Sequence, residues 1–427
     1  MKSLLSLVAL ACVAAASPIA DQVPLNSPHA FAHPDFPNFD LNAIRLVQFE
    51  DQSAPVQMTE WQKLEAKSRG FKYFDVTDTP HLGSSAQLRI QSVFPEPNAT
   101  EKVLPILKTL STKGPEENLR KFSSFRTRHY RSETGAQSQA WLVSKIAEVA
   151  RVHHGGMGFR FTSREGQADG LTLKSFLTNV KRSPSPNSLT HGGRTRSSSE
   201  SMGPPAPTME SLLLAPTRTA RKSLFISIST ISSDNFPFSN MLFFLPAPGA
   251  DDDGSGSVTI LESYRGLLAA DFHPERAVEF HWYSAEEGGL LGSQAVAQHY
   301  EANNVNVIAM SQFDMTAWVK RGTREEVGII GDFVDEGLTA FNKALVETYL
   351  DIPWVETKCG YACSDHASWM KAGYPSSFTI ESSFENSNQN IHSTNDRIDV
   401  SDEFSFDHML EFSKLAVAFA VELGGSK

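Results

Sequence analysis

Two helices and two short strands alternate along the middle of the chain, and this order most constrains the fold. Apolar residues recur at helical spacing over residues 258–268 and 290–300. Residues 277–282 and 305–313 are short and apolar, as buried strands are. The alternation predicts an α/β domain with a mostly parallel central sheet and helices on both faces. In such a sheet the functional site lies beyond the carboxyl ends of the strands.

Acidic side chains gather at these strand ends. Residues 251–253 are consecutive aspartates ahead of the first helix. Glu286 and Glu287 follow the first strand, and Asp314 follows the second. A carboxylate can bridge two cations, and another carboxylate nearby can take a proton from an attacking water. Together with the late His392, the pattern predicts a hydrolase that uses a pair of metal ions, with zinc as the expected metal.

Each feature has an ordinary structural explanation when it stands alone. Asp251 and Asp253 can cap the following helix, because the helix dipole favours acids there. A pair of glutamates is usually a solvated surface, and a lone His392 is most simply a surface histidine. The ordered set of motifs, rather than any single member, favours a metal site.

Five motifs resemble the di-zinc aminopeptidases of metallopeptidase family M28, specifically the secreted fungal leucine aminopeptidases. The motifs are APGADDDGSG at 247–256, SAEEGGLLGS at 284–293, QFDMT at 312–316, CGYACSDH at 359–366 and IHST at 391–394. The resemblance covers most of residues 86–427. It implies a zinc-exopeptidase-like α/β fold with a single catalytic domain over residues 81–427. It also implies an enzyme that releases N-terminal hydrophobic residues from peptides, with leucine preferred.

The resemblance further implies a role for each site residue. Asp252 would bridge two zinc ions. Glu287 and His392 would complete the ligands of one ion, and Asp314 would hold the other. Glu286 would be the general base, which takes a proton from a metal-bridging water and passes it to the leaving amine.

A short cysteine loop adds another candidate residue. The resemblance implies that Tyr361 helps to hold the developing oxyanion. Cys359 and Cys363 are the pair that remains when Cys12 leaves with a signal peptide, and an even pair in an oxidising compartment predicts a disulfide. A metal site is the alternative for this spacing, but no second Cys/His pair accompanies it.

The N-terminal residues predict an exported precursor. Residues 1–17 have the basic start, short apolar run and small-residue end of a secretory signal peptide. Residues 18–80 are expected to form a propeptide, with a helix at 59–67; a solvated arm is the alternative. Asn98 lies in the glycosylation sequence Asn-Ala-Thr and is expected on the surface.

Charge narrows the set of partners. The formal net charge of the 427-residue chain is −11, so nucleic acid and anionic membranes are not expected to bind. No apolar stretch is long enough to span a bilayer. The expected partners are peptides with a free N-terminus and the protein's own propeptide. The resemblance implies a monomer.

One element of the family pattern is absent. Members have a strand ending in Gly-Ala-His-x-Asp-Ser ahead of the bridging acid, and its histidine ligates the ion that Asp314 would hold. No histidine occurs between Leu224 and Pro248, and His191 lies too far upstream. Residues 192–239 are rich in Ser, Pro, Thr and Arg, which is typical of a disordered insertion.

We interpret residues 192–239 as an error of the gene model. Read from the third base of each codon, residues 211–220 can spell Ile-Ile-Ile-Gly-Ala-His-Ser-Asp-Ser. Codons 221–223 can contain the splice donor GTAAGT, and codons 238–239 the acceptor TTTAG, which would make the intervening codons a retained intron. If the insertion is genuine, the alternative is a catalytically impaired pseudo-peptidase that acts as a binding module. Another alternative is a relative with different specificity, such as a carboxypeptidase or a cyclase.

Overall fold

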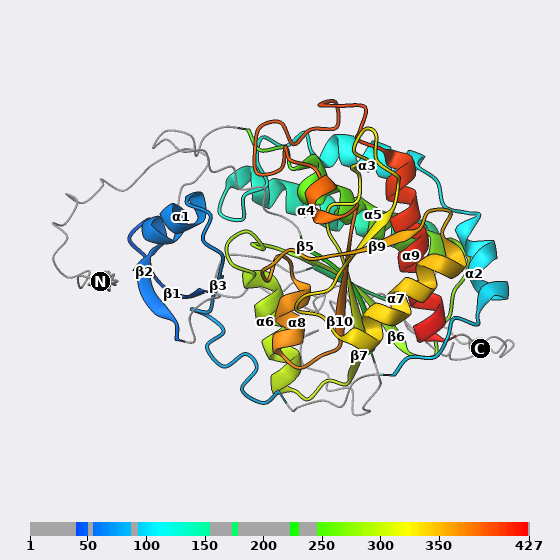
Figure 1. Cartoon of the computed structure of the whole chain (residues 1–427), viewed down its shortest axis with the longest axis horizontal. Coiled ribbons are helices and arrows are strands. Elements are labelled where there is room, and N and C mark those ends of the chain that lie inside the picture. The colour runs from blue at the N-terminus through cyan, green and yellow to red at the C-terminus, as the bar shows by residue number, and fades with distance from the viewer. Residues whose placement is uncertain are drawn as a thin grey trace, which may run out of the picture.

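The computed structural model consists of a large α/β domain and a small N-terminal module (Figure 1). The structure describes residues 40–49, 54–86, 93–153, 173–177, 223–229 and 246–425. The expected signal peptide at 1–17 and most of the anomalous stretch at 192–239 lie outside these residues. We use the name N-terminal module for the described part of residues 40–86.

A seven-stranded sheet forms the centre of the α/β domain. Its strands, in spatial order, are β4 (Leu173–Leu177), β6 (Ala277–Tyr283), β5 (Ser223–Ser229), β7 (Val307–Phe313), β10 (Ser376–Ile380), β8 (Val327–Ile330) and β9 (Trp354–Thr357). Neighbours are parallel except for β4 with β6 and β10 with β8. The mostly parallel sheet is therefore confirmed. Strand β5 lies inside the stretch 192–239 and occupies a central position between β6 and β7.

Helices cover both faces of this sheet, as the sequence predicts (Figure 1). Phe280 and Trp282 of β6 belong to the larger apolar core, to which one set of helices contributes. That set is α2 (Thr100–Leu107), α3 (Lys113–Phe122), α4 (Glu133–His153), α5 (Gly256–Ala269), α7 (Glu336–Tyr349) and α9 (Phe406–Gly424). Tyr283 instead packs in a second core with α6 (Leu291–Ala302) and α8 (His366–Lys371). The two cores lie on opposite faces because successive side chains of a strand alternate.

The N-terminal module has its own small sheet. Strands β2 (Val56–Thr59), β1 (Ile44–Phe49) and β3 (Tyr73–Asp75) pair in that order, antiparallel throughout. Helix α1 (Glu60–Ser68) confirms the helix expected at 59–67. It begins with a capping box, in which Thr59 and Gln62 exchange hydrogen bonds between side chain and backbone. The three strands were not predicted.

A buried ion cluster supports the module internally. Lys63 Nζ lies 2.8 Å from Glu60 Oε1 and 3.0 Å from Asp75 Oδ2. Arg45 Nε donates to the same Asp75 oxygen at 2.7 Å. Removing one member of such a cluster would leave an uncompensated buried charge, which costs about 3–5 kcal/mol. The cluster therefore fixes α1 relative to the small sheet.

The module docks on the α/β domain next to the end of β6. The backbone N–H of Asp75 donates to the carbonyl of Gly289 at 3.1 Å. Gln294 Nε2 donates back to the carbonyl of Asp75 at 3.0 Å.

Within the described ranges, no helix is long and apolar enough to cross a membrane.

Candidate active site

The predicted site residues converge at the carboxyl ends of the parallel strands. Glu286 and Glu287 follow β6, and Asp314 is the residue directly after β7. Asp252 lies in the turn Ala250–Ser255 that leads into α5. His392 comes from the loop after the short 3₁₀ helix Phe384–Asn386. The structure therefore brings these residues together at the edge of the sheet where the sequence placed them.

Three of the four predicted metal ligands form one compact group. His392 Nε2 lies 2.9 Å from Asp252 Oδ2 and 2.7 Å from Glu287 Oε1. One ligand atom from each residue lies within 4.8 Å of the others. Carboxylate oxygens with an imidazole nitrogen suit zinc, and three protein ligands with an open position are typical of a catalytic zinc. The donor set therefore fits a divalent ion.

The charges within this group already favour a cation. Desolvation lowers the pKa of His392, but Glu287 and Asp252 outweigh it and raise that pKa to about 10. Burial alone would raise the pKa of Glu287, yet the charges of His392 and Lys67 hold it well below its usual range. The two carboxylates thus share a positive charge between them. A divalent ion bound there would take the place of the imidazole proton.

Asp314 lies near the group without being part of it. Its Oδ2 accepts a hydrogen bond of 2.7 Å from Ser364 Oγ. The charge of Asp314 helps to raise the pKa of Glu286 and of Tyr361, so these side chains are close to it. Among the described residues, the compact group contains only Asp252, Glu287 and His392.

Glu286 and Tyr361 face the same acidic centre. Burial, and then the charges of Glu287 and Asp365, raise the pKa of Glu286 well above its usual value. Burial, followed by the charges of Glu286 and Glu287, also raises the pKa of the Tyr361 phenol. Tyr361 therefore keeps its proton at neutral pH and remains a hydrogen-bond donor.

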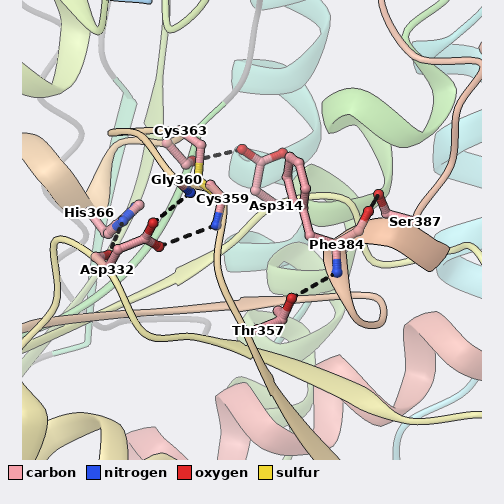
Figure 2. The surroundings of a disulfide bond; sticks show 10 residues. Asp314, Asp332, Thr357, Cys359, Gly360, Cys363, His366, Phe384 and Ser387 are labelled. Carbon is pink, nitrogen blue, oxygen red and sulfur yellow. Dashed lines mark hydrogen bonds between the residues drawn. A yellow bond between two sulfur atoms is a disulfide. The ribbon is translucent and has the colours of Figure 1, made fainter. Parts of the chain in front are cut away.

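The loop that carries Tyr361 is closed and anchored. Cys359 and Cys363 form the predicted disulfide. Asp332 accepts hydrogen bonds from the backbone N–H of Cys359 at 3.3 Å and of Gly360 at 2.6 Å (Figure 2). A short covalent loop with two further backbone anchors limits the positions that Tyr361 can take.

Three site residues that are not glycine have a left-handed backbone. The φ angles are 57° at Ala285, 55° at Met315 and 54° at His392. Such conformations cost about 1–3 kcal/mol each and persist where the surroundings over-determine them. Ala285 precedes Glu286 and Met315 follows Asp314, so the strain falls on the loops that carry the site.

The flanking aspartates have different roles. Asp253 Oδ1 accepts from the backbone N–H of Gly256, the first residue of α5, at 2.9 Å, but the N-cap position is Ser255 and not Asp253 as predicted. Asp251 does not cap the helix, so that part of the prediction is wrong. Its carboxylate instead accepts from Ala317 N at 3.2 Å and from Asn388 Nδ2 at 3.0 Å. Asp251 thereby ties the turn to two other loops of the site.

Asp396 is a supporting residue that the sequence analysis missed. Its carboxylate accepts from the backbone N–H of Asp251 at 2.9 Å and of Asp252 at 3.0 Å. Because it lies four residues after His392, Asp396 links the loops of two candidate ligands. Nothing in its local sequence distinguishes it from an exposed loop aspartate.

Arg128 is the second supporting residue that was missed. It is fully buried, and Nη2 donates to the carbonyl of Gly249 at 2.6 Å; Nη1 donates to the carbonyl of Pro248. Burial lowers its pKa to about 10, while the charges of Asp396 and Asp253 act in the opposite direction. It remains a cation and offsets negative charge behind the candidate metal ligands.

Comparisons with known proteins give consistent similarities over most of the chain. A family model described as Peptidase family M28 matches residues 231–417. Leucine aminopeptidase 1 of Penicillium rubens is 41% identical over 377 residues, covering 86% of this chain and 86% of that protein. Leucine aminopeptidase 1 of Coccidioides posadasii is 39% identical over 440 aligned residues, covering 99% and 98%. The crystal structure of Legionella pneumophila LapA aminopeptidase shares the fold, with a TM-score of 0.69 and 24% identity over 90% of this chain and 98% of that one.

Asp396 holds the backbone of Asp252 in place, so we predict that Asp396→Asn weakens metal binding. The substituted side chain would place its NH₂ group, a donor, against the backbone N–H of Asp251 or Asp252, which is also a donor. The backbone of Asp252 would then shift, and its carboxylate would no longer point at the proposed metal position. We expect zinc affinity, measured by calorimetric titration of the metal-free protein, to fall about 10–100-fold. Asp399→Asn is the matched control, because that carboxylate is exposed and pairs with Arg397 on the same loop. Equal affinities in two folded variants would contradict the positioning role.

Proposed function

The chain belongs to peptidase family M28, and from that membership and the site geometry we propose that it is a secreted zinc aminopeptidase. It would release hydrophobic N-terminal residues, above all leucine, from peptides. The observation that carries the proposal is the compact group of Asp252, Glu287 and His392 beside Glu286. The relatives named leucine aminopeptidase support the substrate class.

The proposed metal complement is two zinc ions. Asp252, Glu287 and His392 would hold one ion, with Asp252 as the bridge to a second ion held by Asp314. Bound zinc would polarise the scissile carbonyl and acidify an attacking water. The free amine of the substrate would lie close to the carboxylates of the site, which would explain why cleavage occurs at the N-terminus.

Glu286 and Tyr361 would carry the proton and the oxyanion. Glu286 would accept the proton of the attacking water and return it to the leaving amine. Its raised pKa, caused by burial and then by its acidic neighbours, suits a group that must both take and give a proton. Tyr361 would donate its hydroxyl proton to the developing oxyanion as a hydrogen bond.

An apolar cluster supports the preference for leucine. Its buried members are Met315, Ile330, Phe378 and Ile380, with Cys359, Cys363, Phe384 and Ile391 packed against them. Met315 follows Asp314, and Ile391 precedes His392, so the cluster adjoins the site. A leucine side chain of the substrate that packs against the partly buried members of this cluster would bury apolar surface.

The N-terminal residues complete the proposal. Residues 1–17 would direct export and be removed. Residues 18–80, which include most of the N-terminal module, would be a propeptide of a monomeric zymogen. Asn98 would carry a glycan; its side chain is exposed at the start of α2.

The missing histidine is explained by the proposed error in residues 192–239. Strand β5 runs parallel to both β6 and β7, so its carboxyl end at Ser229 faces the loops of Glu287 and Asp314. Strand β5 lies within residues 221–239, so in the shifted reading the segment Ile-Ile-Ile-Gly-Ala-His, read from residues 211–220, would take its place. The histidine at the end of that replacement strand would be suitably placed for a second ion.

Sequencing of the spliced transcript across codons 185–250 tests this explanation. We expect Gly-Ala-His-x-Asp-Ser in frame and no codons for residues 221–239. A transcript that encodes the residues as written would leave the proposed second zinc ion without the histidine ligand that should bind it together with Asp314. It would favour the catalytically impaired pseudo-peptidase.

The activity itself is tested with paired substrates. We expect the zinc-loaded protein to hydrolyse leucine arylamide and to reject N-acetyl-leucine arylamide, because acetylation removes the free amine. Chelation should abolish the activity and added zinc should restore it. Cleavage of the blocked substrate would point to another specificity in the family, and zinc binding without any hydrolysis would point to a binding module.

The role of Glu286 is tested by Glu286→Gln. We expect kcat to fall about 10²–10⁴-fold, because the amide cannot accept a proton, while the zinc content stays unchanged. Glu148→Gln, an exposed change on α4, is the control. Turnover that persists in a zinc-loaded Glu286→Gln enzyme would disprove the assignment of the base.

A further inference from the structure

A lysine of the N-terminal module reaches a candidate metal ligand. Lys67 lies in the last turn of α1, and its Nζ is 2.6 Å from Glu287 Oε2. The same ammonium donates to the backbone carbonyl of Glu287, also at 2.6 Å. The Lys67 side chain is only 18% exposed. This contact places a fixed positive charge directly on the site.

The Lys67 ammonium lies where it would compete with a metal ion for the Glu287 carboxylate. Glu287 Oε1 faces His392, and Glu287 Oε2 is taken by Lys67. The charge of Lys67 also acts on Asp252, the proposed bridging ligand. An ammonium has no lone pair and cannot ligate a metal, so it can only occupy the carboxylate.

A second lysine of the module contacts the other side of the site. Lys72 Nζ lies 4.1 Å from the centroid of the Tyr361 ring, within the range of a cation–π interaction. Lys67 and Lys72 flank the turn between α1 and β3, where Gly70 supplies the positive φ of 85°. The turn therefore spans from the metal group to the proposed oxyanion donor.

We propose that Lys67 is a built-in counter-cation that opposes zinc binding while the N-terminal module is docked. Zinc and the docked module then compete for Glu287. This inference rests on the proposed function, and it makes Lys67 the residue that regulates zinc binding at the proposed metal site. The ion cluster of Lys63 and Asp75 supports it, because that cluster holds α1, and so Lys67, in a fixed place.

The competition must act in both directions. If Lys67 weakens zinc binding by some factor, zinc weakens docking of the module by the same factor. Zinc therefore loosens the segment around residues 67–72, where a protease can reach the chain. Metal uptake and exposure of the segment become one linked equilibrium.

Zinc titration of the full metal-free chain tests the proposal. We expect Lys67→Met to bind zinc about tenfold or more tightly than the wild type, within the usual range of coupling between sites. Lys343→Met is the matched control, because Lys343 also pairs with a carboxylate, Glu356 at 2.8 Å, but lies on α7 away from the site. Lys67→Arg keeps the charge and should keep the weak binding.

Limited trypsin digestion supplies the second readout. In the wild type, added zinc should speed cleavage after Arg69 and Lys72, and in Lys67→Met this dependence on zinc should be largely lost. If wild type and Lys67→Met bind zinc equally tightly, the counter-cation is disproved while the metal site stands. If neither protein binds zinc, the proposed metal function falls together with this inference.

Discussion

Asp252, Glu286 and Glu287 meet at one edge of the sheet, where their negative charges repel one another. Two unit charges 4 Å apart repel by about 4 kcal/mol at the effective dielectric near a protein surface. Burial, and then the charges of the neighbouring carboxylates, raise the pKa of Glu286 well above its usual value. A fold that gathers carboxylates in this way must supply compensating positive groups from elsewhere in the chain.

The compensation comes from three distant segments. His392 lies between Asp252 and Glu287, Arg128 lies behind the turn of Asp252, and Lys67 holds the outer oxygen of Glu287. The site is therefore stabilised by residues far apart in sequence, and a change in one of them alters the field at the others.

This distribution explains what the sequence could and could not predict. The α5 helix and the Glu286 loop were predicted, because their signals are local: helical spacing and a strand end. Strand β5 was missed, since its alternating residues lie within a stretch of low-complexity composition. Arg128 and Lys67 were missed for another reason. Their roles depend on contacts 121 and 220 residues away along the chain, which no local pattern encodes.

The N-terminal module both positions and occupies the Glu287 loop. Lys67 donates to the carbonyl of Glu287, Lys63 donates to that of Gly288 at 3.4 Å, and Asp75 N donates to that of Gly289. Three successive carbonyls thus lose a donor when the module leaves, although Gln294 still donates to Gly289 at 2.7 Å. A metal ion on the freed Glu287 carboxylate would then hold the loop in place of the module. Because one loop contacts the N-terminal module and also carries Glu287, the contacts by which the module supports the loop are the same ones that, in our proposal, oppose zinc binding.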